Sequence, residues 1–204
     1  MPVPPYRLPS LCSDFFTASS ASGLLCLLSA LLLSGCSTYV SLPTYGVVPD
    51  FALTDQLGRE FQREERLAGK VWLANFIFTT CAGPCPRMSA QMKEIRDSLK
   101  VHDVRFVSFT IDPARDTPTV LAAYGKRFGA DPDRWYFLTG PQAELHKLSR
   151  NAFMLGNVDG TLEHSTRFVL IDRHSRIRGY YDSSDRESLR ALVKDLERLA
   201  RSSA

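Results

Sequence analysis

The strongest constraint on the fold is a pair of cysteines that follows directly on a nearly all-apolar segment. Residues Val71–Phe78 read VWLANFIF, which predicts a central strand buried on both faces. Residues 78–86 read FTTCAGPCP and contain Cys81 and Cys85. A helix with an apolar stripe is expected from about Cys85 to Leu99. This order of strand, thiol-bearing turn and helix favours an α/β fold with its chemistry at the carboxyl end of the strand.

The two thiols suit two kinds of chemistry. Beyond the N-terminal region Cys81 and Cys85 are the only cysteines, so within the domain neither has another thiol to pair with. Residues i and i+4 share one face of a helix, and a helix N-terminus favours thiolate over thiol. A thiolate is both a nucleophile and a metal ligand. The pair can therefore cycle between dithiol and disulfide or hold a soft metal ion, whereas a static disulfide would close too short a loop to add much stability.

The remaining sequence alternates between expected strands and helices. Strands are expected at Phe51–Thr54, Glu60–Phe61, Val104–Ile111, Trp135–Leu138, Thr166–Ile171 and Ile177–Tyr181. Helices are expected from Pro118 to Phe128 with Thr117 as N-cap, from Pro141 to Arg150, and after a capping box at residues 184–187. The order βαβαβ, then an antiparallel hairpin and a helix, predicts a mixed sheet flanked by helices. With a dithiol at the carboxyl end of the first central strand, this α/β arrangement is a thioredoxin-like fold.

Length and charge bound the kind of protein. The chain has 204 residues, enough for a leader and one domain, and 44% hydrophobic residues support an ordinary globular core. The formal charge of +3 is small and dispersed, so nucleic acid is not an expected partner. The basic cluster Arg173–Arg178 is interpreted as a solvated hairpin tip. The expected organisation is a signal peptide at 1–36, a flexible tether at 37–49 and a domain at 50–204.

The leader ends in a pattern typical of lipoproteins. The apolar run Gly23–Leu33 is too short to span a bilayer comfortably, and it leads to the sequence LSGC ending at Cys36. Small residues before a cysteine resemble a bacterial lipobox, which implies cleavage before Cys36, lipidation of that residue and loss of Cys12 and Cys26. An uncleaved signal-anchor is the alternative. Either way the domain is expected on the outer side of the cytoplasmic membrane, the periplasmic side, where thiol pairs meet oxidants.

A metal would need a third ligand, for which the chain offers four histidines. His102, His146 and His174 are interpreted as ordinary surface or helix residues. His164 stands immediately before the expected strand Thr166–Ile171, and in a thioredoxin-like domain the loop before that strand packs against the dithiol turn. Two thiolates and one imidazole suit copper, whereas structural zinc would want a fourth protein ligand. Without the fold assumption, His164 is equally well a plain loop histidine.

Several motifs in the same order carry a family resemblance. They are Phe78-Thr79-x-Cys81-x-x-x-Cys85-Pro86, Ser108-x-Thr110-Ile111-Asp112-Pro113-x-Arg115-Asp116-Thr117-Pro118, Trp135-x-Phe137-Leu138-Thr139-Gly140, and His164-Ser165 before a strand ending in Ile171-Asp172. From about Val48 to Leu196 the sequence resembles the SCO/SenC family of extracytoplasmic, copper-binding, thioredoxin-like proteins.

The resemblance implies a site and a role. It implies that Cys81, Cys85 and His164 bind one copper ion, Cu(I) or Cu(II), and that the two cysteines form a redox-active pair that can close to a disulfide. It further implies a monomeric copper chaperone, a thiol reductant, or both, acting on the copper-centre subunit of cytochrome c oxidase or on another extracytoplasmic cuproprotein. Ala82-Gly83 is a smaller linker than the family often has, which leaves the ligands intact.

Two other functions are considered beside copper binding. A membrane-tethered thiol–disulfide oxidoreductase with incidental metal binding would need only the thiols. A thiol peroxidase is weaker, because the usual Pro-x-x-x-Thr-x-x-Cys frame is missing around Cys81. The resemblance implies that the loop with Asp112 and Asp116 lies near the metal face, where it could help partner docking or contact the ligands. The preferred interpretation is a turn in which Asp and Pro set the backbone and cap the following helix. Met88 and Met92 lie on the apolar stripe of the expected helix and are interpreted as core, not as thioether ligands.

Overall fold

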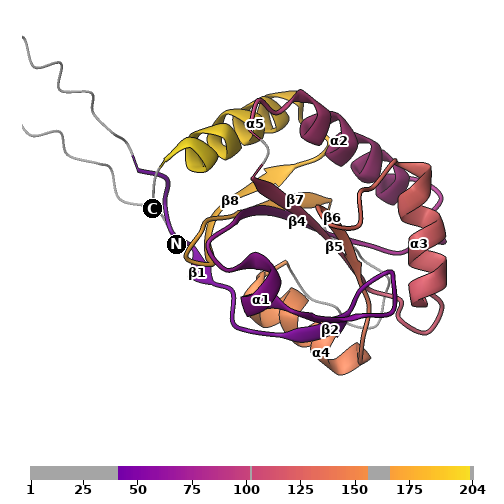
Figure 1. Ribbon diagram of the computed structural model, residues 1–204. Coiled ribbons are helices and arrows are strands. Elements are labelled where there is room, and N and C mark those ends of the chain that lie inside the picture. Colours follow the sequence, from indigo (N-terminus) through magenta and orange to yellow (C-terminus); the bar gives the residue numbers. More distant parts are fainter. Residues whose placement is uncertain (1–40, 102, 156–165, 203–204) are drawn as a thin grey trace, which may run out of the picture. The chain divides into compact units, whose positions relative to one another are not determined.

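A six-stranded mixed sheet lies at the centre of the molecule, with helices on both of its faces (Figure 1). The computed structural model describes residues 41–101, 103–155 and 166–202. The sheet order is β1-β8-β7-β4-β5-β6. Its strands are β1 (Gly46–Val47), β4 (Val71–Ile77), β5 (Val104–Thr110), β6 (Trp135–Leu138), β7 (Arg167–Ile171) and β8 (Arg176–Asp182). A separate hairpin consists of β2 (Ala52–Thr54) and β3 (Glu60–Gln62).

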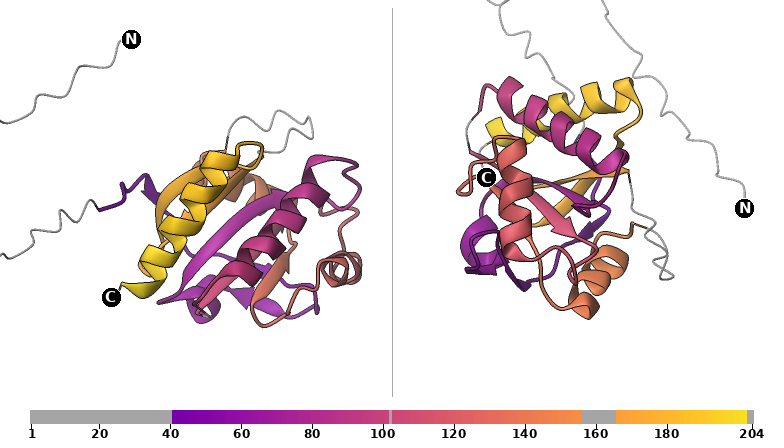
Figure 2. Two further views of the ribbon diagram at one scale, coloured as in Figure 1. Left: turned by 90° about the horizontal axis from the view of Figure 1, so that it is seen from above. Right: turned by 90° about the vertical axis from the view of Figure 1, so that its right-hand side faces the viewer.

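Two apolar layers pack against the two faces of the sheet. One layer is covered by α2 (Pro84–Ser98), α3 (Pro118–Arg127) and α5 (Arg186–Arg201). The other is covered by α1 (Arg63–Leu67), α4 (Gln142–Lys147) and the π-helix η1 (Leu148–Ala152). Figure 2 shows α2 and α5 lying side by side across the first face. Every residue of β4 is buried, as expected for a central strand covered on both sides.

Strand direction decides where the functional end of the sheet lies. β4 pairs in parallel with β5, so that Ile77 is opposite Thr110. β4 pairs antiparallel with β7, so that Ala74 is opposite Val169. The carboxyl ends of β4 and β5 and the amino end of β7 therefore meet at one end of the sheet. The cysteine turn begins at this end.

The outer edge of β6 is covered by the β2–β3 hairpin. Thr54 forms an isolated antiparallel bridge with Thr139. The buried Gln56 amide imitates a further strand residue, because it donates to the carbonyl of Trp135 at 2.9 Å and accepts from the N–H of Phe137 at 2.9 Å. These contacts satisfy backbone groups that an edge strand would otherwise leave open.

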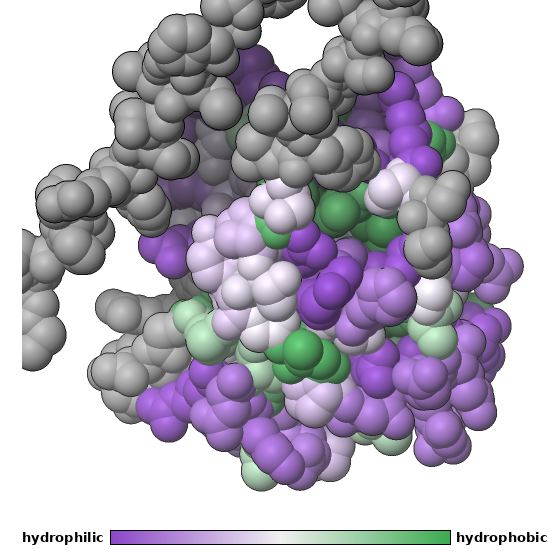
Figure 3. All heavy atoms as spheres, turned by 90° about the vertical axis from the view of Figure 1, so that its left-hand side faces the viewer, coloured by the Kyte–Doolittle hydropathy of each residue, from purple (hydrophilic) through white to green (hydrophobic). Residues whose placement is uncertain are grey.

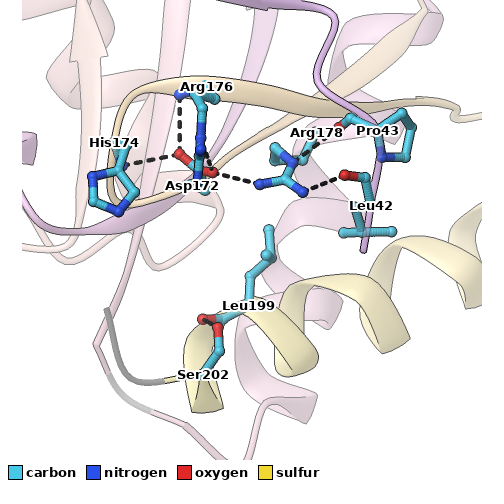
Figure 4. A network of polar contacts seen from close by, with 8 residues as sticks. All are labelled: Leu42, Pro43, Asp172, His174, Arg176, Arg178, Leu199 and Ser202. Atoms are coloured by element: carbon cyan, nitrogen blue, oxygen red, sulfur yellow. Dashed lines mark hydrogen bonds and ion pairs between the residues drawn. The ribbon is translucent and has the colours of Figure 1, made fainter. Parts of the chain in front are cut away.

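The N-terminal part of the described chain is fixed to the sheet by Arg178 (Figure 4). This guanidinium is buried, bonds the Asp172 carboxylate at 2.7 Å and donates to the carbonyls of Leu42 and Pro43. Burial raises the pKa of Asp172, but hydrogen bonds from Arg178 and Arg176 outweigh it and hold that pKa below its ordinary value. Arg178, Asp172 and the carbonyls of Leu42 and Pro43 thus form a structural lock that holds the N-terminal segment. The basic cluster is therefore more than the expected solvated turn.

The lock also changes the interpretation of the expected tether. Gly46 and Val47 form β1 and pair with Ile177 and Arg176 of β8, and the N–H of Tyr45 donates to the Ile177 carbonyl at 2.9 Å. From Leu42 onward the segment expected as a flexible linker is therefore held by the domain. Its lack of periodicity gave no sign of this, because a two-residue strand is too short to show a pattern.

Helix boundaries show smaller differences. Thr117 caps α3 as predicted, accepting from the N–H of Val120. The cap of α5 is Asp185, which accepts from the N–H groups of Glu187 and Ser188, so the expected capping box starting at Ser184 is wrong by one residue. The expected helix at 141–150 is observed as α4 followed by η1.

The surface around β1 is largely hydrophilic, with small separate apolar areas (Figure 3). Tyr45 and Val47 are exposed apolar side chains of this edge, and the exposed Met154 lies beside Gly46. Within the three described segments, no helix has the length and apolar character needed to cross a bilayer.

Candidate metal centre

The cysteine turn connects the carboxyl end of β4 to the start of α2. The chain leaves the sheet after Ile77, and the N–H of Cys81 donates to the Phe78 carbonyl at 3.2 Å. Helix α2 begins at Pro84, where the missing N–H of proline costs no intrahelical hydrogen bond. Cys85 is the second residue of the helix, close to its unpaired N–H groups.

The turn brings both sulfurs to one place as buried thiols. Cys81 is 7% exposed and Cys85 is 0% exposed, and no disulfide joins them. The backbone N–H of Cys85 donates to the Sγ of Cys81 at 3.4 Å. Cys81 precedes the helix, so the two side chains meet through the turn rather than through a shared helical face. The predicted proximity is observed, and the predicted reason for it is corrected.

Burial opposes the thiolate that the helix N-terminus was expected to favour. Desolvation raises the pKa of Cys85 to about 12, and the hydrogen bond with Cys81 and the charges of Cys81 and Asp116 add to the effect. A hydrogen bond with the backbone of Phe78 lowers this pKa but does not reverse the shift. Cys85 is therefore a thiol at neutral pH, and a metal ion that binds its sulfur must displace a proton.

A buried carboxylate ties the cysteine turn to the neighbouring strand. Asp116 is 0% exposed. Its oxygens accept from the N–H of Thr79 at 3.2 and 3.3 Å and from the Thr79 hydroxyl at 2.5 Å. They also accept from the hydroxyl of Thr110, the last residue of β5, at 2.5 Å. Asp116 thus holds the backbone two residues before Cys81.

These contacts agree with the interpretation of Asp112 as a turn residue and change the interpretation of Asp116. Asp112 is a turn residue, as expected: its carbonyl accepts from the N–H groups of Arg115 and Asp116, and its carboxylate pairs with Arg115 at 2.9 Å. Asp116 was expected to set the turn or cap the helix, but Thr117 is the cap and Asp116 supports the cysteine turn. The residues around Asp116 carry no local signal for this contact, because Asp116 and Thr79 are 37 residues apart. Only the family resemblance implied that this loop lies near the metal face.

The structure describes two of the four histidines. His146 is half-buried on α4, and His174 is exposed in the β7–β8 turn, at the opposite end of the sheet from the thiols. His164, His102 and Cys36 lie outside the described residues. The chain enters β7 at Arg167, at the same end of the sheet as the cysteine turn. Within the described segments no group of three or more His, Cys, Asp or Glu side chains could hold a metal ion.

The methionines of α2 are core residues, as predicted. Met88 and Met92 are buried in the apolar layer between α2 and the sheet. The Met92 sulfur lies 3.9 Å from the Ser108 hydroxyl. What the described site offers is therefore a dithiol, which fits a soft metal ion or disulfide chemistry.

Sequence reasoning missed a buried hydroxyl pair near the thiols. Ser89 stands four residues after Cys85 on the buried face of α2, and its hydroxyl lies 3.0 Å from that of Tyr124. The signal that could have revealed the pair is a serine on the apolar stripe that also carries Met88 and Met92.

Comparison with known proteins agrees with the geometry. The family model described as SCO1/SenC matches residues 41–201. The SCO1 protein homolog of Bacillus subtilis (strain 168) is 31% identical over 160 residues, covering 75% of this chain and 82% of the relative.

Two solved structures share the architecture. BsSco, described as a member of the Sco family of cytochrome c oxidase assembly proteins and as having a disulfide switch, gives a TM-score of 0.68 at 29% identity, covering 78% of this chain and 96% of that chain. Copper-bound ScoI from Bradyrhizobium japonicum gives a TM-score of 0.58 at 26% identity, covering 76% and 99%. The predicted thioredoxin-like α/β fold is confirmed. Since the family model spans most of the sequence and a relative covered over most of its length exceeds 30% identity, the chain belongs to the SCO1/SenC family.

Proposed function

We propose that this protein is an extracytoplasmic copper-binding factor that acts as a metallochaperone, a thiol reductant, or both, in assembling the copper centre of cytochrome c oxidase. The observation that carries the proposal is the pair of buried thiols, Cys81 and Cys85, held together at the start of α2. Sulfur donors of this kind select Cu(I) over harder metal ions. Copper here is cargo, so the protein needs to bind it and give it up.

The proposed ligand set is Cys81, Cys85 and His164. The described residues provide the two sulfurs and no third ligand nearby, so a further donor has to come from elsewhere in the chain. His164 is the candidate because it precedes β7 by three residues, and β7 starts at the sheet end that bears the thiols. Two thiolates would balance the charge of Cu(II) and leave one negative charge with Cu(I), with the imidazole completing the coordination.

Anchoring at Cys36 completes the proposal. The sequence LSGC after an apolar run supports lipidation of this residue. A lipid anchor would keep the domain at the outer face of the membrane, where the copper-centre subunit of an oxidase or another cuproprotein could meet it.

A thiol–disulfide oxidoreductase is the second candidate. It is favoured by the closeness of the two sulfurs, and the relative BsSco is described as having a disulfide switch. The candidates differ in one requirement. Disulfide exchange needs the dithiol alone, whereas stable Cu(II) binding needs an imidazole nitrogen as well.

Copper titration of the full chain tests the proposal. Cu(I) would be added anaerobically in competition with a chelator, and Cu(II) followed by optical and spin-resonance spectra. We expect Cys81→Ala and Cys85→Ala to lose both forms, and His164→Ala to keep part of the Cu(I) binding but lose stable Cu(II). His174→Ala is the matched control, since this exposed histidine lies at the other end of the sheet. If His164→Ala equals the wild type in both states, the ligand set is wrong and the oxidoreductase reading leads.

The oxidation state of the thiols provides a second test. A disulfide between Cys81 and Cys85 removes both thiolates, so the oxidised protein should take up no copper until it is reduced. Mass spectrometry verifies the oxidation state before each titration. Undiminished copper uptake by the fully oxidised protein would rule the proposed site out.

A further inference from the structure

The end of the sheet opposite the thiols carries a group of arginines that the proposed function does not use. The β7–β8 turn and the last turn of α5 meet there, because Arg173 in the first donates to a backbone carbonyl in the second at 2.9 Å (Figure 4). Residues 172–178 and 197–201 together hold five arginines and two carboxylates. We call these two segments the basic end. The adjoining Lys70 pairs with Asp103 at 2.9 Å and adds no net charge.

The two carboxylates do not neutralise the basic end. Asp172 is buried and is shared by Arg176 and Arg178, at 2.8 and 2.7 Å. Glu197 pairs with Arg201 at 2.7 Å. The side chains of Arg176 and Arg201 are nevertheless 42% and 58% exposed. An excess of positive charge therefore reaches the surface at this end of the domain.

The chain enters the domain next to the basic end. Arg178, a residue of the basic end, donates to the carbonyls of Leu42 and Pro43. Only residues 37–41 separate Leu42 from Cys36, the proposed lipidation site. An extended chain spans at most about 3.6 Å per residue, so this spacer reaches no further than about 20 Å. A lipid anchor at Cys36 would therefore keep the basic end close to the membrane surface.

We propose that the basic end is a membrane-contact surface, which binds the anionic headgroups of phospholipids in the membrane to which the chain is anchored. Arginine suits this role because its guanidinium forms paired hydrogen bonds with phosphate oxygens. The short tether raises the effective concentration of the basic end at the membrane, so weak individual contacts suffice. The inference rests on the anchoring proposed above and not on copper binding.

Contact at the basic end would also orient the copper site. Strand β4 runs from this end of the sheet to the cysteine turn, because Trp72 near its start is opposite Ile171 at the end of β7. Its seven residues span about 20 Å. The thiols would therefore face away from the lipid, towards protein domains that stand outside the bilayer.

Arginine accessibility on vesicles tests the inference. The full chain would be reconstituted on vesicles of phosphatidylcholine alone and on vesicles that also contain the anionic lipid phosphatidylglycerol. Phenylglyoxal modifies exposed guanidinium groups, and mass spectrometry would measure its labelling of each arginine. We expect labelling of Arg173, Arg176 and Arg201 to fall about fivefold on the anionic vesicles only. High salt should restore it, because the attraction is screened.

Arg115 is the matched control. Its side chain is 67% exposed and pairs with the Asp112 carboxylate at 2.9 Å, much as Arg201 pairs with Glu197, but it follows β5 at the thiol end of the sheet. Labelling of Arg115 should be the same on both kinds of vesicle. Equal labelling of the basic end on both kinds overturns the inference, as does equal protection of Arg115.

A charge variant adds a second measurement. The double change Arg173→Gln and Arg201→Gln should weaken the contact about fivefold for each arginine, so that Arg176 regains most of its labelling on anionic vesicles. Arg115→Gln should leave Arg176 protected. Labelling on phosphatidylcholine alone shows whether each variant is folded. A variant that is folded and still fully protected at Arg176 counts against the inference.

Failure of the inference can be told apart from failure of the proposed anchor. A chain retained on both kinds of vesicle without protection of its arginines contradicts the inference alone. Retention on the anionic vesicles only, with protection, contradicts the anchor and leaves the basic end as a lipid-binding surface. Retention on neither kind contradicts both. Loss of copper binding fails the proposed copper site without changing the labelling.

Discussion

Asp116 gives the sharpest test of how the fold holds the cysteine turn. Its carboxylate is completely buried and accepts from three donors: the Thr79 N–H, the Thr79 hydroxyl and the Thr110 hydroxyl. Replacing Asp116 with Ala leaves all three donors without this acceptor. Each unsatisfied buried donor costs about 1–3 kcal/mol, and hydroxyls can turn to other acceptors whereas the N–H cannot. We expect Asp116→Ala to lower the free energy of unfolding by about 3–5 kcal/mol.

Asp116→Asn separates charge from shape. The amide keeps one acceptor oxygen and nearly the same volume, so the loss should be smaller, about 1–2 kcal/mol. Both variants should also bind Cu(I) more weakly, because Thr79 stands two residues before Cys81 and its backbone is held by the carboxylate.

Urea unfolding of the reduced, metal-free protein and chelator competition for Cu(I) provide the two measurements. Asp103→Ala is the control, since Asp103 is exposed and pairs with Lys70 at the surface, an interaction worth less than about 1 kcal/mol. If Asp116→Ala costs no more stability than Asp103→Ala, the buried network does not hold the turn. If stability falls but Cu(I) affinity is unchanged, Asp116 supports the fold and not the thiol geometry.

Two of the remaining predictions test the contact between Arg178 and Asp172, and the third tests the lipobox at Cys36. Arg178→Met should cost about 3 kcal/mol, since it leaves the buried Asp172 with one arginine, and should raise amide exchange at Tyr45; unchanged exchange there would contradict the lock. The pKa of Asp172 is lowered in the folded state, so this carboxylate contributes to stability above about pH 4, and the contribution is lost as pH falls through the folded-state pKa. The stability lost in Asp172→Asn, measured by urea unfolding, should therefore become smaller in acid. A loss that stays constant with pH would refute the assignment. Cys36→Ala should abolish palmitate labelling of the protein, and equal labelling of the variant and the wild type would end the lipoprotein proposal.

Much of the fold could be predicted because its elements have strong local signals. The all-apolar run of β4 indicated a strand buried on both faces, and the apolar stripe of α2 indicated a helix on the sheet. Thr117 followed by Pro118 located the start of α3, because a cap and an N-terminal proline act within a few residues. Each of these signals depends on neighbours in the sequence.

Contacts between distant segments could not be predicted in the same way. Arg178 lies in a basic cluster that is typical of a solvated turn, but its guanidinium is buried against carbonyls about 135 residues earlier. Asp116 lies in a loop rich in Asp and Pro that is typical of a turn, but its partner Thr79 is on another element. In both cases local composition is the same for a surface role and a buried role, and only the sheet topology distinguishes them.

The geometry of the cysteine turn is therefore fixed before a ligand binds, whereas Cys85 still has to lose its proton. The Cys85 N–H bond to the Cys81 sulfur and the Asp116 bonds to Thr79 fix the turn before any ligand arrives, which reduces the ordering needed on binding. Burial acts in the other direction, since moving the pKa of Cys85 from 9.0 to about 12 makes its deprotonation about 4 kcal/mol more costly. None of the main influences on this pKa comes from a positively charged group. A soft metal ion bound to both sulfurs would supply positive charge beside Cys85, so the same burial that keeps Cys85 protonated favours a ligand that binds strongly to sulfur.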